Sequence, residues 1–369
     1  MDKYQVAIVG ASGYAGIELV RWLLPHPGLE LVAAAADSEV GQALSDLYPA
    51  LLGQTDLRFC TVEAVLELAQ TGHIQPNSAN LTAVFLAVPQ TVALDLAPAF
   101  LATGVAVLDL SADFRLQSPE TYAQWYNHEH TATDWLPQAV YGLPELFRPQ
   151  LQQQAARRLQ GQLANLIACP GCYPTASALA AAPALAAGLV SSQLPVIIDA
   201  LSGVSGMGRK AQMAGQFVTI NEDMRAYNVG RHRHTPEIEQ TLSAVAGHPV
   251  SVQFTPHLVP ITRGLLATAN LALQPGTTPE SVAEVYAAAY AAEPFVQFLP
   301  VGQMPQTAAV RGTNLAQVGL FVDERTNQLV ACCALDNLGK GAASQAIQCA
   351  NILFGWPENT GLEQIGAVV

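Results

Sequence analysis

The residue best suited to chemistry in this chain is Cys172, in the segment Ala168-Cys-Pro-Gly-Cys-Tyr-Pro-Thr175. An Ala-rich stretch follows, which we expect to form a helix over Thr175–Leu185. A thiol at a helix N-terminus has its thiolate stabilised by the helix dipole, and such cysteines have pKa values of roughly 3.5–7.5 instead of about 8.5. Buried, inert cysteines are more common, but they seldom lie in turns rich in proline and glycine. We therefore predict that Cys172 is a covalent nucleophile.

A second interpretation of this segment stays open, because Cys169 and Cys172 form a CxxC pair. Such pairs make reversible disulfides, so we retain the hypothesis that oxidation of this pair switches the protein off. The remaining cysteines fit a role in the core: Cys60, Cys332, Cys333 and Cys349. Their spacing gives neither a disulfide framework nor a paired metal site, so we expect no metal and a reducing, cytoplasmic setting.

A thiolate nucleophile needs a partner that handles protons, and histidine is the natural one at neutral pH. His232 and His234 lie in the basic segment Gly230-Arg-His-Arg-His-Thr-Pro-Glu-Ile238 of an otherwise acidic chain. If this segment is extended, the two histidines share one face. The same segment also fits a solvated face or an oligomer contact. We interpret the other histidines as structural: His26, His73, His128, His130, His248 and His257.

A glycine-rich turn, Gly10-Ala-Ser-Gly-Tyr-Ala-Gly16, joins an expected strand, Val6–Val9, to an expected helix, Gly16–Leu24. Glycines allow a tight turn and close approach of a pyrophosphate, and the helix N-terminus attracts negative charge. The GxxGxxG spacing is weak evidence alone, but its strand–helix context favours dinucleotide binding. Asp37, after the next strand, favours NAD because an acidic residue there binds the ribose 2′-hydroxyl; no Lys or Arg adjoins it to bind a 2′-phosphate.

Further segments could bind an anion. Asp109-Leu-Ser-Ala-Asp-Phe-Arg115 follows an apolar strand, at the edge where α/β sheets bind ligands. Ser202-Gly-Val-Ser-Gly-Met-Gly-Arg-Lys210 is a Gly/Ser loop that ends in two cations, and it fits either an anion cradle or a lid. Arg263-Gly264 and Arg311-Gly-Thr-Asn314 fit turns as well as sites.

The surrounding pattern predicts an α/β protein with two domains. Expected apolar strands alternate with helices in the first part: Val6–Val9, Leu29–Ala35, Ala83–Val88 and Val105–Leu110. Uninterrupted apolar strands imply a parallel sheet covered on both faces, as in a Rossmann-type doubly wound domain. We expect irregular structure between residues 116 and 148, and then an α+β domain with a mixed sheet and a hairpin turning at 323–327.

We place the dinucleotide-binding domain at residues 1–168 and a catalytic and oligomerisation domain at 169–337. The C-terminal helical segment, 338–369, is expected to pack back on the first domain. The chain has 369 residues and a net charge of −13, which disfavours nucleic acid and anionic membranes as partners. No leader or membrane-spanning stretch is evident, so we expect a small-molecule enzyme.

Taken together, these motifs resemble those of the N-acetyl-gamma-glutamyl-phosphate reductases of arginine biosynthesis, which are relatives of aspartate-semialdehyde dehydrogenase. The resemblance runs almost end to end. Besides the glycine turn, the 109–115 segment, the Ser/Gly loop and the two segments around Cys172 and His234, it includes Tyr141-Gly-Leu-Pro-Glu145, Phe254-Thr-Pro-His-Leu-Val-Pro-Ile-Thr-Arg-Gly264 and Asp336-Asn-Leu-Gly-Lys-Gly341.

The resemblance implies reduction of N-acetyl-L-glutamyl 5-phosphate by NADPH through a thioester on Cys172. It assigns the acid/base role to His234 in preference to His232, and it suggests a homo-oligomer, a tetramer or a dimer. Residues implied for the cofactor are Gly10, Ser12, Gly13, Tyr14, Ala15, Gly16, Ser38, Gly206 and Asn337. Residues implied for the substrate and its phosphate are Arg115, Ser205, Arg209, Lys210 and His232.

Two positions depart from the family pattern. Cys169 stands where an asparagine is usual, and Asp37-Ser38 stand where Ser/Arg-type residues are usual, so the family favours NADP while Asp37 favours NAD. Substrate length is set by pocket shape, so an aspartate-semialdehyde-type or an N-acetyl-aminoadipyl-phosphate reductase remains the alternative. A nucleotide-sensing regulator is the alternative outside enzymes, and the presence of both Cys172 and His234 argues against it.

Overall fold

The computed structural model describes residues 3–70 and 81–366. His73 and the last three residues of the 338–369 segment lie outside this range. The chain forms two compact units, each described by itself below. Unit 1 comprises the described residues up to Pro170 together with Ala342–Glu363, and unit 2 comprises Gly171–Gly341 and the segment from Gln364 on.

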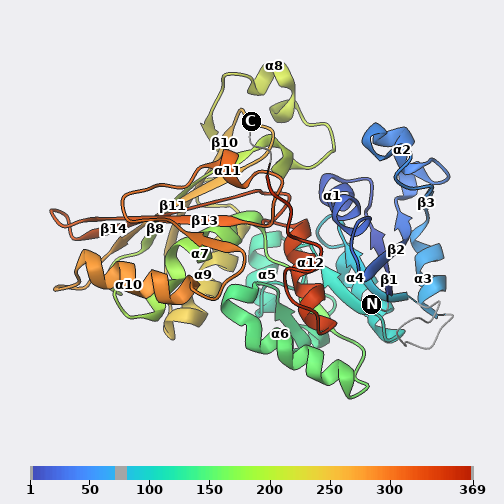
Figure 1. Cartoon of the computed structure of the whole chain (residues 1–369), viewed down its shortest axis with the longest axis horizontal. Helices are drawn as coiled ribbons and strands as arrows, with labels where there is room; N and C mark the ends of the chain where they lie inside the picture. The colour runs from blue at the N-terminus through green and yellow to red at the C-terminus, as the bar shows by residue number, and fades with distance from the viewer. Residues whose placement is uncertain (1–2, 71–80, 367–369) are drawn as a thin grey trace. The chain divides into compact units, whose positions relative to one another are not determined.

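The described part of unit 1 contains a parallel sheet with the strand order β3-β2-β1-β4-β5-β7-β6 (Figure 1). Its strands are β1 (Tyr4–Val9), β2 (Leu29–Ala35), β3 (Phe59–Cys60), β4 (Leu81–Leu86), β5 (Ala106–Asp109), β6 (Ala139–Tyr141) and β7 (Leu166–Ala168). Every residue of β4 and β5 is buried, as expected for parallel strands covered on both faces. The strand order reverses at β1, which therefore marks the ligand-binding crevice of a doubly wound sheet.

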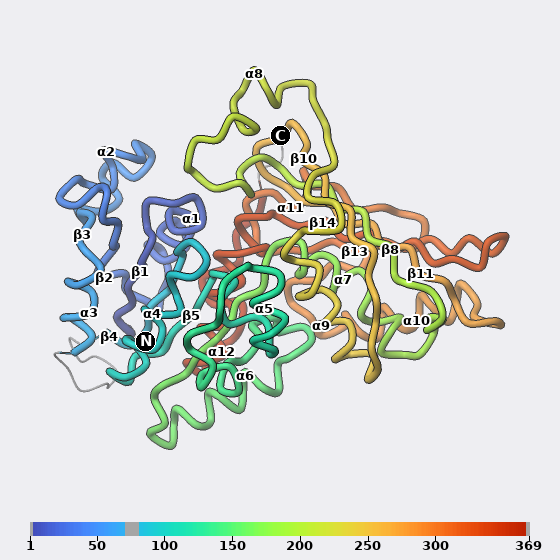
Figure 2. Tube along the Cα trace, turned by 180° about the vertical axis from the view of Figure 1, so that it is seen from behind, coloured from blue at the N-terminus to red at the C-terminus, as the bar shows by residue number. Residues whose placement is uncertain are grey.

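Helices cover both faces of this sheet. The described helices of unit 1 are α1 (Tyr14–Leu23), α2 (Leu44–Leu47), α3 (Val62–Gln70), α4 (Ala93–Ala102), α5 (Pro119–Tyr126), α6 (Pro144–Leu159) and α12 (Ala343–Leu353). Helix α12 packs against α1 and α6, so the chain returns to unit 1 near its end. Helix α3 contacts β1, β2 and β4, and α4 contacts β4 and β5; both helices can be followed from behind in Figure 2.

The prediction of irregular structure over residues 116–148 was wrong. This stretch contains α5, a 3-10 helix over Thr133–Gln138, strand β6 and the start of α6. Two of its three prolines begin helices: Pro119 and Pro144 occupy the first helical turn, where no backbone N–H is needed. Ser118 completes the start of α5 by accepting a hydrogen bond from the Thr121 N–H at 3.1 Å.

Unit 2 contains, within its described residues, a mixed sheet in the order β12-β13-β14-β11-β8-β10-β9. The strands are β8 (Val196–Gly203), β9 (Arg225–Ala226), β10 (Val252–Val259), β11 (Leu265–Ala272), β12 (Val296–Phe298), β13 (Ala316–Asp323) and β14 (Gln328–Leu335). The predicted hairpin is confirmed, because β13 and β14 are antiparallel with Asp323 opposite Gln328. Its longer helices, α7 (Cys172–Ala186), α9 (His234–Ala246) and α10 (Pro279–Tyr290), gather on one side of the sheet (Figure 1).

The C-terminal residues of unit 1 are held by a buried histidine. His26 is 2% exposed, and its Nδ1 accepts hydrogen bonds from the N–H groups of Gly28 and Leu29 at 3.1 and 2.8 Å. Because Nδ1 is an acceptor, Nε2 carries the proton and donates to Asn351 Oδ1 and Thr360 O, at 3.1 and 3.0 Å. These bonds require the neutral ring, and burial lowers the pKa of His26.

We predict that this histidine makes the protein less stable in mild acid. The folded protein holds the pKa of His26 below its ordinary value of about 6.5, so the unfolded chain binds the extra proton. The stabilisation is present above pH 6.5 and is lost as the pH falls below it. Thermal unfolding at several pH values should show this loss, and His26→Gln should reduce the slope. An equal change in slope from His248→Gln, at an exposed histidine, would contradict the assignment.

Candidate active site

The glycine turn lies at the crevice where β1 runs between β2 and β4. The Gly10 and Ala11 N–H groups both donate to Ala35 O at the end of β2, at 3.0 and 2.9 Å. Gly10 has a φ of +87°, and a Cβ there would lie 2.3 Å from Ala87 O after β4. A Cβ on Gly16 would lie 2.2 Å from Gly10 O. Both positions therefore require glycine.

Helix α1 begins directly after this turn, at Tyr14. Its N-cap is Gly13, which provides no side-chain cap, so the helix N-terminus is open to an anionic ligand. Ser12 is held from the other side, because its carbonyl accepts from the Tyr48 hydroxyl at 2.7 Å. The cofactor residues predicted between Gly10 and Gly16 therefore lie in one turn at the N-terminus of α1. Its shape suits a dinucleotide pyrophosphate.

The two residues expected to select the cofactor lie in a short 3-10 helix, Asp37–Glu39, two residues after β2 ends. Both are exposed, and Ser38 donates a hydrogen bond to the Glu39 carboxylate. Asp37 Oδ1 lies 3.4 Å from the Val62 N–H at the start of α3. In the sequence, no Lys or Arg adjoins Asp37 and Ser38. The fold brings Arg58 to the same loop, where it donates to Gly41 O at 2.9 Å.

Arg115 is buried in unit 1 and organises the chain just before the nucleophile. Its Nε donates to Cys169 O at 2.7 Å, and its Nη2 donates to Leu110 O at 2.8 Å. The Cys169 N–H in turn donates to Asp109 O at 2.8 Å. Burial, together with the carboxylate of Asp113, raises the pKa of Asp109 to about 7. The backbone leading to Cys172 is therefore fixed on both sides of Cys169.

Cys172 is the first residue of α7, three residues before the predicted start of that helix. Pro174 is accommodated within the first turn, which explains why the sequence suggested a later start. Gly171 is the N-cap, and its N–H donates to the Glu237 carboxylate at 3.0 Å. Glu237 is fully buried in the first turn of α9. Sequence reasoning missed this residue, which joins the nucleophile's turn to the helix of the histidines.

Gly341 packs directly against Cys172, the predicted nucleophile. A Cβ at Gly341 would lie 2.7 Å from Cys172 Cβ and 2.8 Å from Asn337 O. Contacts this short do not occur between real Cβ atoms, so any side chain here must displace Cys172 or the Asn337 turn. The motif that contains Gly341 was recognised in the sequence, but its contact with Cys172 was not.

The His232–His234 segment is not extended. It is a turn that leads into α9, with His234 as the first helical residue. The turn nevertheless brings the two imidazoles together, with ring centroids 4.9 Å apart. Both rings contact Tyr173, the residue after the nucleophile, at centroid distances of 5.4 and 5.9 Å.

The environments of these rings set their protonation. Burial, and then the positive charge of Arg233, lowers the pKa of His232 to about 4. His232 is therefore neutral at pH 7, and its Nδ1 accepts a hydrogen bond from the His234 N–H at 3.2 Å. Burial raises the pKa of Tyr173, and it raises the pKa of Tyr227 to about 12. These tyrosines therefore contribute neutral hydroxyls.

The Ser202–Lys210 loop is anchored to the Asp336–Gly341 turn. Asn337 Nδ2 donates to Ser205 Oγ at 2.9 Å, and its Oδ1 accepts from the Gly264 N–H at 2.8 Å. Gly206 lies beside this pair, and Arg209 and Lys210 are exposed at the end of the loop. Asn337 thus connects three of the motifs recognised in the sequence.

A buried carboxylate supports the same turn. Asp336 is fully buried, and Arg263 donates to it through Nε at 3.0 Å and through Nη2 at 3.0 Å. The Gly312 N–H donates to Asp336 as well, at 2.6 Å. Arg263 and the 311–314 segment, which the sequence left open between site and turn, are therefore bound to a structural carboxylate.

The six cysteines are thiols, and none forms a disulfide. Pro170 and Gly171 lie between Cys169 and Cys172, and Gly171 is extended, with φ −73° and ψ 163°. Burial also raises the pKa of the Cys169 thiol, which makes it a poor nucleophile.

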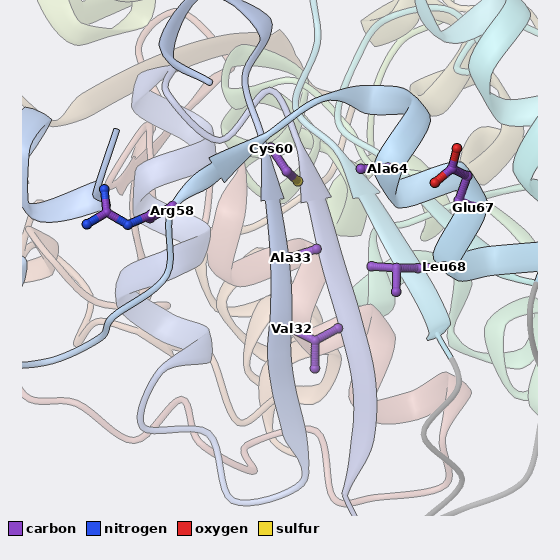
Figure 3. A pocket seen from close by; sticks show the side chains of 7 residues that line it. All are labelled: Val32, Ala33, Arg58, Cys60, Ala64, Glu67 and Leu68. Atoms are coloured by element: carbon purple, nitrogen blue, oxygen red, sulfur yellow. The ribbon is translucent and has the colours of Figure 1, made fainter. Parts of the chain in front are cut away.

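An open pocket of about 460 Å³ lies in unit 1 beside the edge strand β3, and it shares Arg58 with the loop after β2 (Figure 3). It is lined by Val32, Ala33, Arg58, Cys60, Ala64, Glu67 and Leu68. None of these residues was predicted as part of a site. Within residues 3–70 and 81–366, no cluster of ligating side chains could hold a metal ion, and no helix is long and apolar enough to cross a membrane.

We predict that Gly341→Ala displaces the nucleophile. The added methyl group would overlap Cys172 Cβ, and a shift of 1 Å at a reacting group costs about 100-fold in turnover. Steady-state kinetics should show this loss in kcat, while circular dichroism shows a folded protein. The matched control is Gly215→Ala, whose Cβ would meet neighbours only at 3.6 Å or more. Equal kcat values for the two variants would contradict the contact's importance.

Comparisons with known proteins agree with these observations. Residues 5–154 match the family model "Semialdehyde dehydrogenase, NAD binding domain", and residues 172–337 match "Semialdehyde dehydrogenase, dimerisation domain". Among solved structures, aspartate semialdehyde dehydrogenase II of Vibrio cholerae superposes with a TM-score of 0.67 at 17% identity, covering 96% of this chain and 98% of that one. The Candida albicans enzyme, solved with NADP, has a TM-score of 0.67 at 16% identity, covering 95% and 98%.

Curated sequence relatives share a much higher sequence identity with this chain than these solved structures do. The N-acetyl-gamma-glutamyl-phosphate reductase of Symbiobacterium thermophilum is 48% identical over 367 residues, covering 99% of both chains. The reductase of the same name from Synechocystis sp. is 45% identical over 365 residues, covering 99% of this chain and 98% of the relative. The chain therefore belongs to the N-acetyl-gamma-glutamyl-phosphate reductase family.

Proposed function

We propose that this enzyme reduces N-acetyl-L-glutamyl 5-phosphate to N-acetyl-L-glutamate 5-semialdehyde, with NADPH as the hydride donor and phosphate as the second product. This reaction is a step of arginine biosynthesis, and we place it in the reducing cytoplasm, where a catalytic thiol persists. The observation that carries the proposal is Cys172 at the start of α7, with two histidine rings packed on the adjacent Tyr173.

The cofactor site proposed here uses the glycine turn of unit 1. The turn fits a dinucleotide because Gly10 and Gly16 have no space for a Cβ and α1 presents an uncapped N-terminus. Ser38 and Arg58 are the residues we propose for the 2′-phosphate, since both belong to or contact the loop after β2. When bound, NADPH supplies the hydride that reduces the thioester carbonyl.

The first chemical step belongs to Cys172. Its thiolate attacks the acyl carbonyl, a carbon–sulfur bond forms, and the bond from carbon to the phosphate oxygen breaks. Gly171 and Glu237 hold the thiolate at the helix N-terminus, where the dipole favours negative charge. We propose that Arg115, Ser205, Arg209, Lys210 and His232 bind the substrate and its departing phosphate.

The proton in the second half of the reaction is assigned to His234. It protonates the oxygen of the thiohemiacetal and takes that proton back as the carbon–sulfur bond breaks, so the aldehyde leaves and the thiolate is restored. His232 suits this role less, because its pKa near 4 keeps it neutral at pH 7. A neutral His232 instead donates a hydrogen bond to the substrate. We propose that Asn337 lies near the nicotinamide of the bound cofactor. It belongs to the same turn as Gly341.

The reaction is best tested in reverse. Phosphate and N-acetylglutamate semialdehyde should reduce NADP faster than NAD, and aspartate semialdehyde should be a poor substitute. The variant Cys172→Ser should lose at least about 10³-fold in turnover, because no covalent thioester forms. The proposal is wrong if this variant keeps most of its activity, or if aspartate semialdehyde is the better substrate.

Variants of the two histidines should have different kinetic effects in the same assay. We expect His234→Asn to lower kcat by about 10²–10⁴-fold, the usual contribution of a general acid or base. His232→Asn should chiefly raise KM for the acyl substrate, because it removes a hydrogen bond and no proton carrier. The opposite ranking of kcat values would transfer the acid/base role to His232.

We also propose that the protein is a homo-oligomer, a dimer or a tetramer, formed through the face of the second sheet that points away from α7. Strand registers align three rows of side chains on this face: His257–Leu201–Leu266, Thr255–Asp199–Thr268–Cys332 and Gln253–Ile197–Asn270–Val330–Phe321. Asp199 is the one charge in these rows, which otherwise hold uncharged polar and apolar side chains. The match to a dimerisation domain supports a second copy as the occupant.

Charges introduced on this face should separate the copies. Ile197 and Phe321 are 38% and 53% exposed, and Ile197→Asp together with Phe321→Glu would place carboxylates in a buried interface. Light scattering should give a multiple of 38.9 kDa for the natural chain and 38.9 kDa for the double variant. Leu159→Asp, at an exposed leucine of α6, is the control. A double variant with unchanged mass would show that this face is not the interface.

A further inference from the structure

The turn between β4 and α4 contains a backbone conformation that its sequence does not favour. Thr91 has a φ of +73°, a region in which β-branched residues are strained. The Val92 N–H points to Pro89 O at 3.4 Å, so Pro89–Val92 form a β-turn with Thr91 at its third position. A positive φ at the third position, and not at the second, is characteristic of a type II turn, in which glycine usually occupies the third position.

A buried carboxylate from another segment holds this turn in place. Asp113 is fully buried, and its Oδ1 accepts from the Thr91 N–H at 2.8 Å. Its Oδ2 accepts from the Ala93 N–H at 3.1 Å and so caps α4, whose own N-cap, Val92, provides no side-chain cap. Tyr122 fixes the carboxylate by donating to Oδ1 at 2.7 Å.

The acceptor selects one orientation of a peptide group. Type I and type II turns differ by a flip of the central peptide, which here joins Gln90 to Thr91. The Thr91 N–H belongs to that peptide, so a flip would turn it away from Asp113. Without the carboxylate, a threonine at this position favours the negative φ of a type I turn. Asp113 therefore determines the direction in which the Gln90–Thr91 peptide group points its N–H and C=O.

The segment that leads into this turn, Ala87–Val88, adjoins the glycine loop. Ala87 is the first residue after β4, and a Cβ on Gly10 would lie only 2.3 Å from its carbonyl oxygen. The Oε1 atom of Gln90, at the second position of the turn, is buried and has no hydrogen-bond partner among the described residues. Buried acceptors are normally satisfied, and this one has no partner in the described part of the chain, so the Gln90 side chain contributes no hydrogen bond from Oε1 to hold the turn.

We propose that Asp113 is a positioning residue for cofactor binding, which holds the Gln90–Thr91 peptide in the orientation that the dinucleotide requires. The inference rests on the proposed function, because it takes the glycine loop as the dinucleotide site. Asp113 itself need not touch the cofactor. The strain at Thr91 is retained because the carboxylate compensates for it and the bound ligand uses the resulting turn.

The test is a rescue experiment, with NADPH binding followed by fluorescence. Asp113→Asn places an amide donor against the Thr91 or Ala93 N–H, and the dissociation constant for NADPH should rise about tenfold, which corresponds to the cost of the strained residue. Adding Thr91→Gly should restore binding to within about twofold, because glycine adopts a positive φ without help. KM for the acyl substrate should change little in either variant.

Asn127→Gly is the matched control in the Asp113→Asn background, since Asn127 is exposed in the same unit and has a φ of +51°. Rescue by Asn127→Gly as well, or none by Thr91→Gly, overturns the inference. If Asp113→Asn does not fold, Thr91→Pro decides the matter: proline has a φ near −65° and no N–H, so it should weaken NADPH binding about tenfold. Normal binding by that variant overturns the inference. Failure of the natural chain to bind NADPH would instead refute the proposed function.

Discussion

The chemistry proposed for this chain depends on the backbone of four residues, Cys169 to Cys172, where the chain passes from unit 1 to unit 2. Buried groups hold it on both sides of Pro170. Arg115 donates to Cys169 O in unit 1, and Glu237 accepts from the Gly171 N–H in unit 2. Charged groups form stronger hydrogen bonds than neutral ones, particularly where water is excluded. The thiol thus begins a helix whose first turn is fixed before substrate binds.

The same principle recurs wherever a loop must keep one conformation. Asp336 binds Arg263 and the Gly312 N–H, and Asp113 binds two N–H groups of the turn before α4. Burying a carboxylate is costly unless its oxygens are paired, so each of these residues fixes its neighbours as well as itself. An acidic chain can therefore provide local anion-binding sites, because its buried carboxylates are neutralised by N–H groups and arginine while Arg209 and Lys210 stay exposed.

Much of this arrangement could be predicted from the sequence, and the reasons are local. The glycine turn, the apolar strands and the 323–327 hairpin are each specified within a few residues, and all three are confirmed. The region 116–148 was misjudged because Pro119 and Pro144 start helices. An extended backbone was the condition under which the two histidines would share a face, but a turn brings the rings together instead. Glu237, Gly341 and Asp113 were missed because each acts on residues distant in sequence, and no spacing rule reports such a contact.

Cofactor preference shows why contacts between residues distant in sequence matter. In the sequence, Asp37 follows the second strand and argues for NAD through the ribose hydroxyl. In the fold its carboxylate is exposed and directed toward the N-terminus of α3, at 3.4 Å from the Val62 N–H. Arg58, twenty-one residues later in the chain, contacts the loop that Ser38 begins. A helix N-terminus and a guanidinium both offset the repulsion between Asp37 and a 2′-phosphate. An acidic residue at this position is therefore compatible with NADP, because its neighbours in space, and not in sequence, determine the local charge.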